Sequence, residues 1–152
     1  MQIDDTDRRI LRRLQAHPGL TAGELAELAG VTPTTCSRRL DRLSRAGVIR
    51  GQRAVIDWAA LGWEVEVSLR FTLDKTDPRA FDDFQAAARK VPEVTEIQTF
   101  LGSVDLRLSV IARDMAHWQQ VYRERILTLP HVADSDALMH ISTIKDSGEL
   151  PL

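Results

Sequence analysis

The sequence predicts an α+β protein of two domains, a helical N-terminal part and a longer part in which strands and helices alternate. Three observations lead to this expectation. Capped helical patterns follow one another up to residue 47, a strand–helix–strand pattern occurs twice after residue 63, and the charge changes sign between the two parts. We therefore expect one domain over residues 1–57, a linker over 58–62 and a second domain over 63–152.

Composition excludes several classes of protein. With 43% hydrophobic residues the 152-residue chain can bury a core, which excludes global disorder. No apolar run approaches the roughly 18 residues of a membrane span, and residues 1–15 are charged throughout, so we expect neither membrane insertion nor secretion. The single cysteine, Cys36, excludes a disulfide framework and a cysteine-built metal site, which favours a reducing cytoplasm.

The first two helices are expected from their end signals. Asp4 can cap a helix that carries Asp7 in its first turn, and residues 17–19, which read His-Pro-Gly, end that helix. Thr21 and Glu24 form a capping box for a second short helix. A glycine at position 30 ends this helix and begins a tight turn.

A third helix is expected after Thr32, with Pro33 at its first position and Gly47 beyond its end. Two helices joined by about four residues, with a glycine in the turn, form the helix-turn-helix pattern. Cys36 and Leu43 mark the buried stripe of the third helix, so its arginines and hydroxyl side chains point the other way.

This basic face predicts DNA binding. Residues 31–56 hold six arginines against one acid, whereas residues 58–152 hold fifteen acids against ten basic residues. A recognition helix presents such groups to the major groove, and residues 48–57 are expected to form a β-hairpin wing beside it. The residues expected to contact DNA are Thr32, Thr34, Thr35, Ser37, Arg38, Arg39, Arg42, Arg50 and Arg53.

The second domain begins with strict alternation of apolar and polar residues over 65–73, which is typical of a half-buried strand. Further strands are expected over 94–101, 104–110 and 132–145. Helices are expected after Asp77 and after Asp114, which can cap the second of them.

The two helices end at matching sequences, whose prolines, Pro92 and Pro130, lie 38 residues apart. The strand–helix–strand unit therefore occurs twice, as in a ferredoxin-like βαββαβ domain with four antiparallel strands and two helices on one face. The other face of such a sheet stays uncovered, which predicts that the chain pairs with copies of itself.

Several segments, spread over nearly all of the chain, match one known family. They are residues 3–11, 25–26, 31–40, 42–43, 47–49, 54–57 and 61–62, followed in the second half by Gly102, Asp105, Pro130, Val132 and Lys145. Together they resemble the Lrp/AsnC family of bacterial and archaeal transcription regulators. The resemblance implies a winged helix-turn-helix domain followed by an effector-binding and oligomerisation domain.

The resemblance also implies the partners. These are double-stranded DNA with roughly palindromic operators and homodimers that assemble to tetramers or octamers, with targets in amino-acid metabolism. Many family members bind an amino acid between C-terminal domains, where it changes assembly or DNA affinity.

The expected effector loop departs from the family pattern. The family commonly has Gly-Asp-Tyr-Asp-Tyr where this chain has Gly-Ser-Val-Asp-Leu over residues 102–106, and Ala137 replaces a common threonine. We expect a less polar effector pocket that involves Gly102, Ser103, Val104, Asp105 and Ala137. It would hold an apolar or aromatic amino acid by its backbone groups, with Asp105 facing the ammonium, or it would hold no amino acid.

No catalytic residue, metal site or cofactor is predicted, because the four histidines lack metal-ligand spacing and no phosphate-binding loop occurs. Two alternatives stay open. One is an enzyme like the sirohaem decarboxylases, which share this architecture and use histidines and arginines of the second domain; the other is a nucleoid-architectural protein that needs no effector. The preferred interpretation is a non-enzymatic regulator that is cytoplasmic and associated with the nucleoid.

Overall fold

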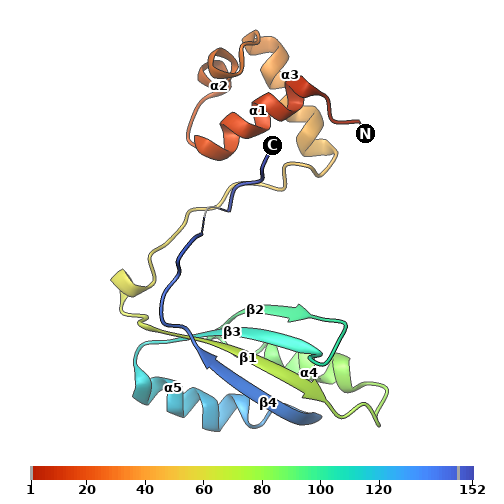
Figure 1. Ribbon diagram of the computed structural model, residues 1–152, viewed down its shortest axis with the longest axis vertical. Helices are drawn as coiled ribbons and strands as arrows, with labels where there is room; N and C mark the ends of the chain where they lie inside the picture. Colours follow the sequence, from red (N-terminus) through yellow and green to blue (C-terminus); the bar gives the residue numbers. More distant parts are fainter. Residues whose placement is uncertain (1, 147) are drawn as a thin grey trace. The chain divides into compact units, whose positions relative to one another are not determined.

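A computed structural model describes residues 2–146 and 148–152 (Figure 1). The chain divides into two compact units, of which the first comprises Met1–Val55 and Lys145–Leu152 and the second comprises Ile56–Ile144. The last residues thus pack with the N-terminal helices, an association for which the sequence analysis found no signal.

The first unit is built on three helices, α1 (Asp5–Ala16), α2 (Ala22–Ala29) and α3 (Pro33–Arg45). The predicted end signals are confirmed: Asp4 caps α1, a capping box begins α2, and the glycine after α2 adopts the left-handed conformation at φ 66°. In addition, the Asp7 side chain accepts the Asp4 N–H, which completes a capping box at α1. A small core joins the three helices and consists of Ile10, Leu25, Ala26, Ala29 and Cys36.

The β-hairpin predicted over residues 48–57 is wrong. Within these residues, all of which the structure describes, no strand forms: the chain bends at residues 48–49 and has no regular secondary structure from 50 to 57. Most of their side chains are exposed, and a two-stranded hairpin without further packing is marginally stable in water. The β-branched residues on either side of Gly51, at positions 48, 49, 55 and 56, therefore did not suffice to pair the two halves of this segment.

The C-terminal residues lie against α1. The Gln15 side chain accepts a hydrogen bond from the Leu150 N–H at 2.8 Å and donates one to the Leu150 carbonyl at 3.4 Å. The Arg12 guanidinium donates from Nε to the Leu152 carbonyl oxygen at 2.8 Å. These contacts account for the placement of residues 148–152 in the first unit.

The second unit has the predicted βαββαβ order. Its elements are η1 (Ala59–Leu61), β1 (Val65–Leu73), α4 (Ala80–Ala88), β2 (Val94–Thr99), β3 (Leu106–Ala112), α5 (Met115–Val121), η2 (Tyr122–Ile126) and β4 (Val132–Met139). In the described residues the strands form one antiparallel sheet in the order β2-β3-β1-β4, as expected for a ferredoxin-like domain. Helices α4 and α5 lie on one face of this sheet (Figure 1).

The core of this unit lies between the sheet and the helices. Its largest fully buried side chains are Phe71, Phe84, Leu69, Leu106 and Leu108. The alternate residues of β1 and β3 stay half-buried on the other face of the sheet, which no helix of the described chain covers. This open face carries the polar residues of both strands.

Two expectations for this unit were wrong in extent. The last strand ends at Met139, opposite Val67, rather than near Lys145. In this register β1, which begins at Val65, could pair with no residue beyond 141, so a strand reaching Lys145 would have no partner. The helix expected after Asp114 keeps regular α-helical geometry only over Met115–Val121 and then widens into the π-helical turn η2. No helix among the described residues is both long and apolar enough to cross a membrane.

Candidate functional site

The N-terminus of α3 is fixed by its own threonines. The Thr32 hydroxyl oxygen accepts a hydrogen bond from the Thr35 N–H at 3.2 Å, and the Thr32 hydroxyl donates to that of Thr35 at 2.9 Å. Thr34, Ser37 and Arg38 are exposed. Thr32 therefore caps the helix and bonds the Thr35 hydroxyl, while the side chains of Thr34, Ser37 and Arg38 are free to meet a partner.

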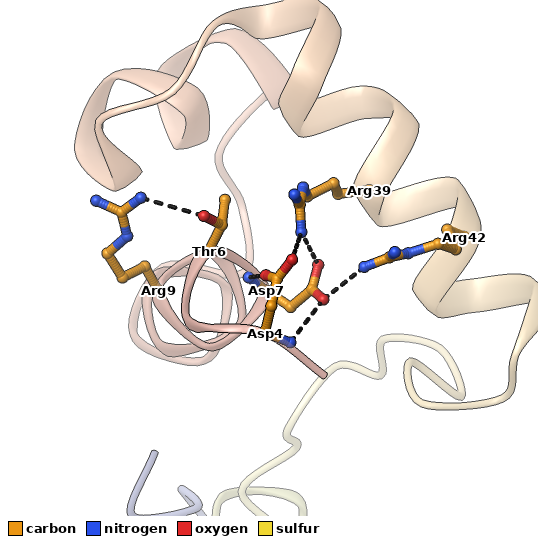
Figure 2. Close-up of polar contacts among 6 residues, drawn as sticks. All are labelled: Asp4, Thr6, Asp7, Arg9, Arg39 and Arg42. Atoms are coloured by element: carbon orange, nitrogen blue, oxygen red, sulfur yellow. Dashed lines mark hydrogen bonds and ion pairs between the residues drawn. The ribbon is translucent and has the colours of Figure 1, made fainter. Parts of the chain in front are cut away.

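A carboxylate network ties α3 to α1. Asp7 is completely buried, and its two oxygens meet Arg39 Nη1 at 3.0 Å and Arg42 Nη2 at 2.5 Å. Arg39 Nη1 also contacts Asp4 at 2.5 Å, so one guanidinium bridges both acids of the capping box. Figure 2 shows the two arginines reaching from α3 towards Asp4 and Asp7.

The network changes the acidity of Asp4. The hydrogen bond from Arg39, followed by that from the Asp7 N–H, lowers the pKa of Asp4 from 3.8 to about 2. Both contacts favour the charged carboxylate, so Asp4 stays ionised at neutral and mildly acidic pH.

The network divides the arginines of α3 into two groups. Arg39 and Arg42 are paired with α1, although 46% of the Arg42 side chain remains exposed. Arg38 and Arg45 are exposed, and together with Asp41, Arg42 and Ala46 they line a shallow hollow of about 430 Å³. A phosphate group approaching α3 would therefore meet Arg38 and Arg45 as the least committed cations.

This pairing of Asp7 with Arg39 and Arg42 was not predicted from the sequence, although a signal was present. Asp7 lies four residues after Ile3 and three before Ile10, on the apolar stripe of α1. A carboxylate on a buried face requires a cationic partner, because an unpaired buried charge is costly.

The predicted wing residues Arg50 and Arg53 are exposed on the irregular segment 48–55. This segment, part of α1 and the C-terminal residues line a hollow of about 580 Å³ in the first unit. Both arginines are accessible to an anionic partner.

The structure brings together three of the five expected effector residues. Gly102, Ser103 and Val104 line a hollow of about 370 Å³ with Phe100 and Leu101. Two arginines that the sequence analysis did not select, Arg70 on β1 and Arg107 on β3, complete its lining. Ala137 lies on β4 opposite Leu69, and neither Ala137 nor Asp105 belongs to the lining.

Asp105 is held inside the fold. One carboxylate oxygen accepts a hydrogen bond from the Leu73 N–H at 2.9 Å, and the other contacts Lys75 Nζ at 2.7 Å. Burial would raise the pKa of Asp105, but the hydrogen bond and charge of Lys75, with the Leu73 N–H, outweigh burial and lower it. A ligand ammonium at this carboxylate would have to displace Lys75.

Folding also gathers groups that are distant in sequence. Asp77, Asp83 and His131 present potential metal-ligand atoms within 4.8 Å of one another, a grouping that residue spacing did not reveal. His131 Nε2 lies 3.1 Å from Asp83, and the Asp77 carboxylate accepts the Arg79 N–H, so these contacts already occupy the cluster. Cys36 is fully buried, and burial raises the pKa of its thiol.

Comparisons with known proteins agree with both units. The family model for the Lrp/AsnC ligand binding domain matches residues 66–150, and a winged helix-turn-helix DNA-binding model matches residues 3–50. The chain is 32% identical to the proline dehydrogenase transcriptional activator of Rhodobacter capsulatus, over 96% of this chain and 95% of the relative. It is also 32% identical to the leucine-responsive regulatory protein of Salmonella typhimurium, over 97% of this chain and 90% of that protein.

A solved structure is similar over its whole length. It is that of a transcriptional regulator from Neisseria meningitidis in complex with L-methionine. It superposes with a TM-score of 0.90 at 30% identity, covering 99% of this chain and 97% of the other.

Proposed function

The chain belongs to the Lrp/AsnC family of DNA-binding transcriptional regulators, and from this premise we propose how it acts. It binds operator DNA through the exposed face of α3 and adjusts this binding in response to a small amino-acid-like effector. Its targets include genes of amino-acid metabolism, and it works in the cytoplasm on the nucleoid. The relative named as an activator of proline dehydrogenase supports targets of this kind.

The observation that carries the DNA-binding proposal is the free basic face of α3. Arg38, Thr34 and Ser37 are exposed along the first half of the helix, where recognition helices meet base edges. Arg45 at the end of the helix and Arg50 and Arg53 beyond it are exposed cations suited to phosphates. Arg39 and Arg42 support this surface by holding α3 on α1.

Recognition of an operator requires two such faces. We propose that residues 62–152 join copies of the chain into dimers and larger even-numbered assemblies, so that pairs of α3 helices meet symmetric half-sites. Symmetric pairing would make the operator roughly palindromic. The open sheet face and the exposed apolar residues of the second unit supply the surface for this pairing.

The effector proposal rests on the hollow beside residues 100–104. Its volume of about 370 Å³ suits a molecule of amino-acid size. The similar Neisseria meningitidis regulator was solved with L-methionine, which supports a ligand of this size for the family fold.

The test is recovery of bound genomic DNA followed by footprinting. We expect discrete protected sites with two related half-sites, and binding that weakens as salt rises. Protection spread evenly over unrelated fragments would contradict a local regulator and favour the nucleoid-architectural alternative.

A further inference from the structure

Two arginines face each other across neighbouring strands at the effector hollow. Arg70 of β1 and Arg107 of β3 are direct partners in the antiparallel register, and both side chains line the hollow. Like charges placed directly opposite on a sheet destabilise it. Such a pair is most easily accommodated when an anion lies between or above the two guanidinium groups.

The carboxylates already near these arginines leave donors free. Arg70 Nη2 contacts Asp136 at 2.6 Å and Arg107 Nη2 contacts Glu96 at 3.3 Å, and both acids lie on the outer strands and are about half exposed. Exposed ion pairs of this kind contribute little free energy. Among the described residues no acceptor meets the buried Nε of either arginine. Each guanidinium therefore retains hydrogen-bonding capacity that the folded chain does not use.

The remaining lining is apolar or backbone. Phe100 and Leu101 are exposed beside the arginines, and residues 102–104 contribute a loop that Thr72 holds by donating to the Ser103 carbonyl at 3.0 Å. None of the described residues that line the hollow is acidic. Asp105, which follows the loop, has both carboxylate oxygens engaged.

From this charge distribution we infer that the effector is a small carboxylate with an apolar tail and no α-ammonium group, such as a 2-oxo acid. The carboxylate meets Arg70 and Arg107, and the tail packs on Phe100 and Leu101. An amino acid would bring a positive ammonium group beside two arginines, whose neighbouring carboxylates, Asp136 and Glu96, are already paired with them. This inference deepens the proposed function and rests on it, since it specifies the ligand of the same hollow.

Matched ligand pairs test the inference on the full-length protein by isothermal titration calorimetry. We compare 4-methyl-2-oxopentanoate with L-leucine and phenylpyruvate with L-phenylalanine, which differ only at the α-substituent. We expect each 2-oxo acid to bind at least about tenfold more tightly than its amino acid. Equal or tighter binding of the amino acids, or no binding of either oxo acid, would overturn the inference.

Variants locate the binding. Arg70→Gln and Arg107→Gln should each weaken oxo-acid binding by about tenfold or more, whereas Arg89→Gln, which changes an exposed arginine after α4, should not. Melting temperatures of the free variants check folding, and we expect no loss because each change removes a like-charge opposition. Unchanged binding in both variants would also refute the assignment.

DNA binding by the same preparations separates the two proposals. If the protein binds its operator but no oxo acid, only the ligand inference fails. If it binds no DNA, the proposed function fails whatever the calorimetry shows.

Discussion

The carboxylate of Asp7 joins the first helix of the N-terminal unit to the helix proposed to recognise DNA. It receives two guanidinium groups and the Asp4 N–H, the last at 3.1 Å, and so the cost of burying its charge is offset by charge-assisted contacts. Both guanidinium groups belong to arginines of α3, Arg39 and Arg42. The orientation of that helix on α1 thus depends on an acid outside the DNA-facing surface.

Replacing Asp7 should therefore destabilise the N-terminal unit against unfolding. We expect Asp7→Asn to lower the free energy of unfolding by about 1–3 kcal/mol, because Arg42 loses its buried partner and Arg39 keeps only Asp4. Urea denaturation followed by circular dichroism measures the loss. Asp5→Asn is the matched control, since Asp5 is exposed in the same first turn and should cost at most about 1 kcal/mol. Equal effects of the two changes would refute the role of Asp7.

The depressed pKa of Asp4 predicts a window of acid sensitivity. Its folded pKa is about 2 against an ordinary value of 3.8, so the ionised group stabilises the fold above pH 4, and this contribution disappears as pH falls from about 4 to 2. The unfolding free energies of wild type and Asp4→Asn, measured against pH, should differ by a constant amount from pH 7 to 5. The difference should then shrink towards zero between pH 4 and 2. A difference that stays constant down to pH 2 would contradict the pairing of Asp4 with Arg39.

At the scale of helices and strands, the sequence predicted those features that depend on interactions between neighbouring residues. The caps at Asp4, Thr21 and Thr32 are satisfied within three residues of themselves, so sequence was enough to locate the helices. The hairpin over 48–57 failed because pairing two strands requires a packing partner, which residue pattern alone does not supply. The end of β4 was missed for a related reason, since the start of its partner β1 at Val65 limits how far β4 can continue.

The candidate sites show the same division. Exposure of Arg38 followed from helical periodicity, whereas Arg39 and Arg42 pair with Asp7, which lies more than 30 positions away in the chain. Likewise, the opposition of Arg70 and Arg107 exists only in the strand register. Contacts of this range depend on tertiary packing, so the loop at 102–104 could be predicted from the sequence but the arginines beside it could not.

Helix α3 and the segment that follows it should affect DNA binding in different ways. Arg38→Ala should weaken binding to the preferred operator by about 1–3 kcal/mol if Arg38 contacts a base, with less effect on unrelated DNA. Arg53→Ala should weaken binding to all DNA about equally and reduce the salt slope by about one. Gel-shift titrations at several salt concentrations measure both. Arg89→Ala serves as the control, and binding by Arg38→Ala equal to wild type would remove α3 from the proposed interface.

At the scale of the whole molecule, the second unit exposes apolar surface that one chain does not cover. Ile141 and Ile144, which follow β4, are 94% and 93% exposed, and Leu138 and Met139 at the end of β4 are about half exposed. Exposed aliphatic side chains grouped along one segment are typical of protein interfaces. The open sheet face beside this segment is largely polar, so the apolar residues after β4 are the stronger source of association energy.

Charging this segment should therefore weaken assembly of the full-length chain. Burying one such side chain contributes about 1.5–3 kcal/mol, so the double variant Ile141→Asp with Ile144→Asp should move the protein towards smaller species at micromolar concentration. Size-exclusion chromatography with light scattering gives the masses. Leu127→Asp is the matched control, because Leu127 is also exposed, at 59%, but follows η2 on the helical side of the unit.

A wild type that is already monomeric would refute the proposed assembly, and a double variant with unchanged mass would exclude this segment from the interface. Since each operator half-site needs its own α3, loss of assembly should also weaken operator binding without any change to the DNA-facing residues.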